Sequence, residues 1–141
     1  MNRLQFLLFL SLVLALGCDS TETRGPATVT RDIGTVQLTV DFGQQKTPLV
    51  TDVVCSEDST VLSITERAHN MNELSLVFRG TGERAFVESI DSLKNEGGGG
   101  NNWIYRVNDE TGSKGAGVFE VDPGDKISWS YGQLPDELLD P

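Results

Sequence analysis

The sequence has few of the residues that build metal centres and nucleophilic catalytic sites. Its 141 residues include two cysteines and one histidine. A zinc site takes about four protein ligands, or about three and a water, and this chain can barely supply three. None of the patterns Gly-x-Ser-x-Gly, His-Glu-x-x-His, the phosphate loop or the Asp-x-Asp-x-Asp-Gly calcium loop is present. The sequence therefore predicts neither a metal site nor an enzyme.

Positive charge is also scarce. Lysine and arginine together number 11 against 21 aspartates and glutamates, so the formal net charge is −10. Nucleic acids are bound through clustered basic side chains that neutralise phosphates. Polybasic segments likewise attract proteins to anionic membrane surfaces. The balance argues against both kinds of partner.

Long hydrophobic runs are limited to one, Leu4 to Leu16, interrupted only by Gln5 and Ser11. As a helix it would cover roughly 20 Å, short of the ~30 Å hydrocarbon core of a bilayer. Arg3 precedes the run, as in the positively charged start of an export signal. We therefore expect residues 1–17 to be a signal peptide rather than a mature transmembrane helix.

The end of this run resembles the bacterial lipobox. Ala15, Leu16 and the small residue Gly17 precede Cys18, and polar residues follow at once. The resemblance implies lipidation of Cys18 and an exported protein anchored in the cell envelope, with the inner or outer membrane leaflet left open. The alternative is an ordinary secretory signal that leaves Cys18 as a thiol or in a disulfide. Residues 18–33 are polar and without periodicity, which is typical of a tether.

Cys55 is the second cysteine. Exported compartments favour disulfides, but pairing with Cys18 requires that Cys18 is not acylated. Free cysteine often behaves as a small buried hydrophobe, and we expect Cys55 to do so at the end of a strand.

Alternation of apolar and polar residues predicts most of the secondary structure. Thr35–Phe42 and 48–55 read as two strands joined by a short turn, which makes a hairpin. A short amphipathic helix follows, capped by Asp58 or Ser59 and ending near Asn70. Further strands are predicted over 74–78, 85–90, 103–107, 118–121 and 126–131, and residues 122–125 form a type II turn between the last two.

This order predicts an α+β fold, a small β-grasp-like domain of hairpin, helix and several antiparallel strands over residues 34–132. Residues 133–141 read as a solvated acidic tail. Four consecutive glycines at 97–100 predict a mobile loop, which could be a flap over a binding edge; a simple connector is the favoured interpretation.

Two segments carry a family resemblance. Residues 102–108 contain Trp103, Tyr105 and then Val-Asn, and residues 119–131 contain Gly-Asp followed by Ile-x-Trp-x-Tyr. Together they resemble the transcobalamin-like C-terminal domain family, found in exported bacterial proteins and in vertebrate cobalamin carriers. The resemblance implies a β-grasp-like fold and a role in ligand binding. The helical barrel of the vertebrate carriers has no counterpart, and Asp109 stands where the family usually has glycine.

We expect the ligand-binding residues to lie near the aromatic segments. Aromatic side chains could stack on a flat ligand, and glycines could let a ligand approach the backbone; the alternatives are that the aromatics fill the core and that the glycines form a hairpin or bulge. The candidates are Asn102, Trp103, Tyr105, Asn108, Gly115, Gly117 and Phe119. The function expected is a non-catalytic, lipid-anchored module for a small ligand, with cobalamin or a related corrinoid implied by the resemblance. The alternative is an interaction module for an envelope protein.

Overall fold

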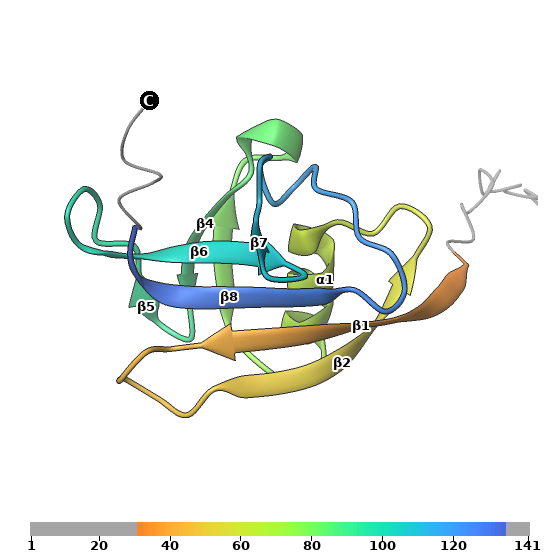
Figure 1. The fold of residues 1–141 in the computed structure, drawn as a ribbon, viewed down its shortest axis with the longest axis horizontal. Coiled ribbons are helices and arrows are strands. Elements are labelled where there is room, and N and C mark those ends of the chain that lie inside the picture. Colours follow the sequence, from red (N-terminus) through yellow and green to blue (C-terminus); the bar gives the residue numbers. More distant parts are fainter. Residues whose placement is uncertain (1–30, 135–141) are drawn as a thin grey trace, which may run out of the picture.

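A computed structural model describes residues 31–134. These residues form eight strands, one α-helix and one short 3-10 helix (Figure 1). In chain order the elements are β1 (Asp32–Asp41), β2 (Leu49–Ser56), α1 (Val61–Asn70), β3 (Leu76–Arg79), η1 (Gly82–Arg84), β4 (Phe86–Ile90), β5 (Leu93–Lys94), β6 (Asn101–Val107), β7 (Glu110–Thr111) and β8 (Lys126–Gln133).

Five strands make the larger sheet, in the order β2-β1-β8-β6-β7. β8 lies at the centre, parallel to β1 and antiparallel to β6. The first strand of the described region therefore pairs with the last one, in the middle of the sheet. Alternation in β1 points Val36, Leu38 and Val40 into the core, and all three are fully buried.

The smaller sheet contains β3, β4 and β5, all antiparallel. β5 contributes only two residues, paired with Ser89 and Ile90. In Figure 1, β4 runs across the direction of β6 and β8 rather than alongside them. Because of this crossing the two sheets share no ladder, although β4 and β6 come close.

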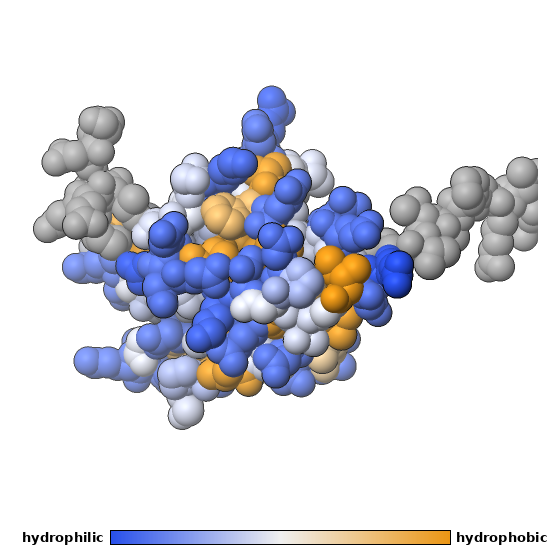
Figure 2. Space-filling model, turned by 45° about the vertical axis from the view of Figure 1, so that its right-hand side comes forward, coloured by the Kyte–Doolittle hydropathy of each residue, from blue (hydrophilic) through white to orange (hydrophobic). Residues whose placement is uncertain are grey.

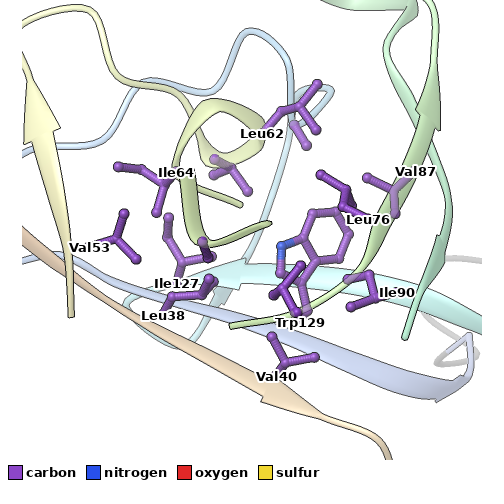
Figure 3. Packing of buried hydrophobic residues seen from close by; sticks show 14 of the residues in the cluster. Leu38, Val40, Val53, Leu62, Ile64, Leu76, Val87, Ile90, Ile127 and Trp129 are labelled. Carbon is purple, nitrogen blue, oxygen red and sulfur yellow. The ribbon is translucent and has the colours of Figure 1, made fainter. Parts of the chain in front are cut away.

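The core lies between the large sheet, the helix and the small sheet. Figure 3 shows Ile64 of α1 near Val53 and Ile127, and Trp129 among side chains of the two sheets. The Trp129 indole is 3% exposed, and its Nε1 donates to the Thr65 hydroxyl at 3.0 Å. Burial of a Trp ring with its one donor satisfied is strongly stabilising.

The helix begins at a capping box. The Ser63 N–H donates to the Thr60 hydroxyl at 3.2 Å, and the Thr60 N–H donates to the Ser63 hydroxyl at 2.8 Å. The prediction of a cap at Asp58 or Ser59 was therefore wrong. The Ser59 hydroxyl instead accepts the Ser56 N–H at 2.9 Å and so closes the end of β2. The predicted end near Asn70 is confirmed.

The predicted α+β, β-grasp-like class is contradicted. Strands make up 46% of the structure and helix 12%, and the strands form two sheets, so the fold is β-rich. The sequence pattern gave one sheet covered by a helix because alternation identifies strands but not their partners. The parallel pairing of β1 with β8 and the separation of the β3-β4-β5 sheet depend on those partners.

The predicted strand at 118–121 is also absent. Val118 to Val121 instead runs past the start of α1, where the Val61 N–H donates to the Phe119 carbonyl at 3.0 Å and the Val121 N–H donates to the Ser59 carbonyl at 2.9 Å. The turn at 122–125 has the predicted type II features, since Gly124 has φ +92° and the Asp125 N–H donates to the Asp122 carbonyl at 3.1 Å.

The predictions for residues 1–17, for Cys18 and most of the tether, and for nearly all of the tail at 133–141 lie outside the described residues. Within 31–134, no helix has the length and apolar content needed to cross a bilayer.

Candidate functional site

A cavity of about 180 Å³ opens between the two sheets where β4 approaches β6. We call it the β4–β6 crevice. It is lined by Ala85, Phe86, Val87, Trp103, Tyr105, Gly115, Ala116 and Trp129. Its walls come from β4, from β6 and β8, and from the segment that follows β7. The strands of both sheets therefore contribute to one hollow.

Four of its eight lining residues are aromatic. Tyr105 lies 5.5 Å from Trp129 between ring centroids, on neighbouring strands β6 and β8. Trp103 is 8% exposed and its indole N–H donates to the Leu93 carbonyl at 2.7 Å. Phe86 is 48% exposed. The inner rings are thus fixed by packing, whereas Phe86 offers an apolar face to solvent.

One side chain ties the two sheets together beside the crevice. The Asn95 Nδ2 donates to the Val87 carbonyl of β4 at 2.7 Å, and its Oδ1 accepts the Trp103 N–H of β6 at 2.7 Å. The amide of Asn95 therefore occupies the place that a further strand would fill between β4 and β6. We call this arrangement the Asn95 bridge.

Next to the bridge, β6 leaves two backbone groups without a partner in the described part of the chain. The Asn108 N–H bonds to the Lys126 carbonyl, so odd-numbered residues of β6 turn away from β8. On that outer side the Trp103 N–H reaches Asn95 and the Tyr105 carbonyl accepts the Gly112 N–H at 3.4 Å. The Trp103 carbonyl and the Tyr105 N–H remain, as one acceptor and one donor on the edge that borders the crevice.

The ionisable group of the crevice stays neutral at physiological pH. Burial raises the pKa of the Tyr105 phenol, while its hydrogen bond to the Lys114 carbonyl acts in the opposite direction. The phenol is therefore a donor already used within the fold. We see no nucleophile and base pair in this crevice.

A second hollow of about 380 Å³ adjoins the crevice on the outer face of the small sheet. It shares Phe86 and is further lined by Val77, Glu88, Ser89, Lys94 and Asn95. Val77 is 48% exposed, so this surface combines apolar groups with one acid and one base. Phe86 and Asn95 connect it to the crevice and the bridge.

Residues 58–133 match the family described as "Domain of unknown function (DUF4430)". The chain belongs to this family. The match begins two residues before the capping box and ends with β8, so it includes every residue that lines the crevice. No curated protein matches the chain.

Two solved structures resemble this fold. Haptocorrin in complex with Cbi has a TM-score of 0.59 and 24% identity over 72% of this chain. A "putative metal binding protein" from Ruminococcus gnavus has a TM-score of 0.56 and 16% identity over 73% of this chain and 100% of its own length. The match spans only 25% of the haptocorrin chain. The fold is therefore transcobalamin-like, and the similarity extends no further than the fold.

Potential metal ligands do not cluster in the described part of this chain. Within residues 31–134, no group of three histidine, cysteine, aspartate or glutamate side chains could hold a metal ion. Cys55 is fully buried at the end of β2, and burial raises the pKa of its thiol. Its expected burial is confirmed.

The structure brings together only three of the predicted site residues. Trp103, Tyr105 and Gly115 line the crevice, and Phe119 does not line it but packs edge-to-face against the Tyr105 ring at a centroid distance of 5.8 Å. Gly117 serves close packing, because a Cβ there would lie 2.4 Å from the Gly82 carbonyl oxygen.

The two predicted asparagines lie at opposite ends of β6. Asn102 Nδ2 donates to the carbonyls of Gly97 and Gly100 and so shapes the glycine loop. Asn108 has φ +51° and, with Asp109, forms the turn between β6 and β7. None of the four glycines at 97–100 lines the crevice, so the alternative interpretation of this loop as a flap has no counterpart at this site.

Sequence reasoning missed Phe86, Ala116 and Asn95. The sequence pattern places Phe86 in the predicted strand 85–90 but does not mark it as a binding residue, because its exposure depends on the crossing of β4 over the large sheet. Asn95 stood at the start of the glycine loop and carried no signal. Only the pairing of strands shows that its amide faces two sheets.

Proposed function

We propose that this protein is a lipid-anchored, exported and non-catalytic module that binds a small organic ligand in the β4–β6 crevice. The observation that carries the proposal is the combination of a ring-lined hollow with an unpaired backbone acceptor and donor at its border. Binding sites of this kind are largely apolar with a few oriented polar groups. The absence of a reactive pair from the crevice supports binding over catalysis.

A corrinoid is the ligand class that we propose. Corrinoids carry carboxamide side chains around a flat macrocycle, and a carboxamide can donate to the Trp103 carbonyl while accepting from the Tyr105 N–H. Phe86 offers a ring for contact with the apolar body of such a ligand. The similarity to haptocorrin in complex with Cbi supports this class.

The size of the site limits what it can hold. A crevice of about 180 Å³ has room for a side group of a corrinoid but not for the whole molecule. Three quarters of the haptocorrin chain have no counterpart in the match. We therefore propose that the domain covers one side of the ligand, alone or together with a partner protein.

Attachment to the membrane is proposed to come from Cys18 rather than from the folded domain. A doubly or triply acylated N-terminus gives stable anchoring without further contact, and the net charge of −10 would not favour an anionic surface. We expect Cys18→Ala to release the protein from membranes or to block its maturation. Unchanged processing and membrane association would contradict the lipobox.

The direct test is calorimetric titration of cobalamin into the purified protein, with Phe86→Ala as the site variant and Met71→Ala as the matched control. Met71 is 51% exposed at the C-cap of α1 and does not line the crevice. We expect micromolar or tighter binding, weakened about tenfold by Phe86→Ala and unchanged by Met71→Ala. Absence of heat and of thermal stabilisation would remove cobalamin as a ligand of this protein alone. Equal effects of both variants would refute the site.

The second candidate function is recognition of an envelope protein without a small ligand. An open strand edge on the opposite side of the large sheet favours it, since exposed edges accept further strands.

A further inference from the structure

The outer edge of β2 differs from the other sheet edges of the described residues. β7 and β5 have two residues each, and β3 has four with an irregular register between Val77 and Phe78. Short strands and bulges are the usual protection of an edge. β2 has eight residues in regular register with β1 from Leu49 to Val54, and within residues 31–134 no strand pairs with its other side.

Backbone groups of β2 point outward in a defined pattern. The Val54 carbonyl accepts Arg67 Nη1 at 2.7 Å, and the Ser56 N–H donates to the Ser59 hydroxyl at 2.9 Å. Even-numbered residues therefore turn away from β1. Val50 and Asp52 follow the same alternation, and no hydrogen bond within residues 31–134 uses their outward N–H and carbonyl groups. The edge is closed at its end by Arg67 and Ser59 and open before it.

The side chains of the same residues form a short exposed row. Val50 is 59% exposed and Val54 is 42% exposed, with the exposed Asp52 between them. An added strand would place its own side chains directly opposite these three. The row therefore favours an added strand with an apolar, a basic and an apolar residue at alternate positions. Because this pattern is symmetric, the added strand could run in either direction.

Charge argues against a second copy of this chain as the occupant. A symmetric antiparallel pair centred on Asp52 would set the two carboxylates opposite each other, and like charges there are destabilising. Both copies would also carry a net charge of −10. On the face shown in Figure 2, hydrophobic groups are separated by hydrophilic ones.

We propose that the β2 edge binds an extended segment of another protein in which a lysine or arginine, flanked at two residues' distance by β-branched or other apolar residues, lies opposite Asp52. Backbone bonds to Val50 and Asp52 supply affinity, and the Asp52 carboxylate supplies the preference for a basic residue. The site is separate from the β4–β6 crevice and does not depend on a corrinoid.

The test uses two synthetic peptides, acetyl-Thr-Val-Thr-Lys-Thr-Val-Thr-amide and the same peptide with glutamate in place of lysine. Each is titrated into the purified ¹⁵N-labelled protein and followed by amide shifts. We expect the lysine peptide to shift the amides of Val50, Asp52 and Val54 and to bind about fivefold more tightly than the glutamate peptide.

Variants of Asp52 separate charge from backbone pairing. Asp52→Lys should reverse the preference, and Asp52→Pro should abolish binding of both peptides, because proline removes an outward N–H without disturbing the bonds to β1. If the proline variant does not fold, Asp52→Asn replaces it and should make the two affinities equal. Shifts confined to other strands, equal affinities in the unmodified protein, or dimerisation through β2 would overturn the proposal.

Discussion

Two seams of the molecule bring distant segments together in opposite ways. At the β1–β8 seam, residues 37–41 pair with 126–130 in a continuous parallel ladder. At the β4–β6 seam there is no ladder, and the Asn95 bridge and the Trp103 indole make the connections. The first seam has fully buried side chains on its core face, such as Leu38 and Ile127. The second leaves a hollow and, within residues 31–134, two backbone groups without a hydrogen-bond partner.

The difference shows where this fold can bind something. A completed ladder satisfies its backbone groups internally and leaves side chains to pack. Where a ladder is interrupted, the strand still orients a backbone donor and acceptor, and the neighbouring strands hold that strand in place. The Trp103 carbonyl and the Tyr105 N–H occupy that position, next to rings whose orientation the core already fixes.

The largest effect is expected at Trp129, which pairs with β1 in the β1–β8 seam and whose ring also lines the crevice. Trp129→Ala removes a ring that is 3% exposed and should lower the free energy of unfolding by about 3–5 kcal/mol. The measurement is urea denaturation. Trp129→Phe is the matched control; it keeps a ring but loses the bond to Thr65, and should cost far less. A small loss for Trp129→Ala would mean that this seam is not the core of the fold.

An intermediate loss of stability is expected at the β4–β6 seam. Asn95→Ala removes both bonds of the bridge and should cost about 1–3 kcal/mol, because the Val87 carbonyl and the Trp103 N–H lose their partner. Urea denaturation measures the loss in the free energy of unfolding. Hydrogen exchange should show faster exchange of the Trp103 amide and little change in the amides of β1. Asn95→Asp serves as the comparison: it keeps the acceptor for the Trp103 N–H but sets a carboxylate oxygen against the Val87 carbonyl, so it should cost at least as much as Asn95→Ala. Uniformly faster exchange would show that the bridge is not local.

The sequence alone was sufficient to predict the two strands of the β1–β8 seam. It was not sufficient to predict the β4–β6 seam. Alternation at 35–42 and 126–131 marks both strands, and their buried residues follow from it. The same alternation says nothing about partners, so the parallel pairing of β1 with β8 could not be predicted. At 118–121 the alternation was misleading, because Val121 is buried against the start of α1 through loop contacts rather than through a ladder.

The candidate site was predicted only in part, because the sequence does not show which strands lie next to each other. Trp103 and Tyr105 belong to a recognisable segment and do line the crevice. Phe86 and Asn95 become neighbours of that segment only because β4 crosses the large sheet. Gly117 was singled out for ligand approach, although its missing side chain accommodates the Gly82 carbonyl.

The smallest effect is expected where a second polar tie holds the small sheet. Asp91, after β4, accepts the Ser75 N–H at 2.7 Å and also bonds Lys46 of the β1–β2 turn. Burial would raise the pKa of Asp91, but the hydrogen bonds from Lys46 and Ser75 and the charge of Lys46 outweigh it and lower this pKa below its usual value.

Because the folded pKa of Asp91 is depressed, its stabilisation is present above the unfolded pKa of about 3.9 and is lost as the pH falls through the lower folded value. Asp91→Asn should cost about 1 kcal/mol at neutral pH and progressively less below pH ~4. Urea denaturation across pH 2–7 measures this convergence. Parallel pH profiles for the two proteins would contradict the role of this carboxylate. Asparagine suits the φ of +46° at this position, so the comparison is free of added backbone strain.

The most direct test of the β4–β6 seam as a binding site is the hydrogen-exchange rate of the Tyr105 amide, measured by NMR with and without saturating cobalamin. The account predicts that this amide exchanges quickly in the free protein and is slowed by the ligand, while the buried amides of β1 are unchanged. Strong protection of Tyr105 in the free protein, or cobalamin-dependent slowing that appears elsewhere and leaves Tyr105 unaffected, would contradict it.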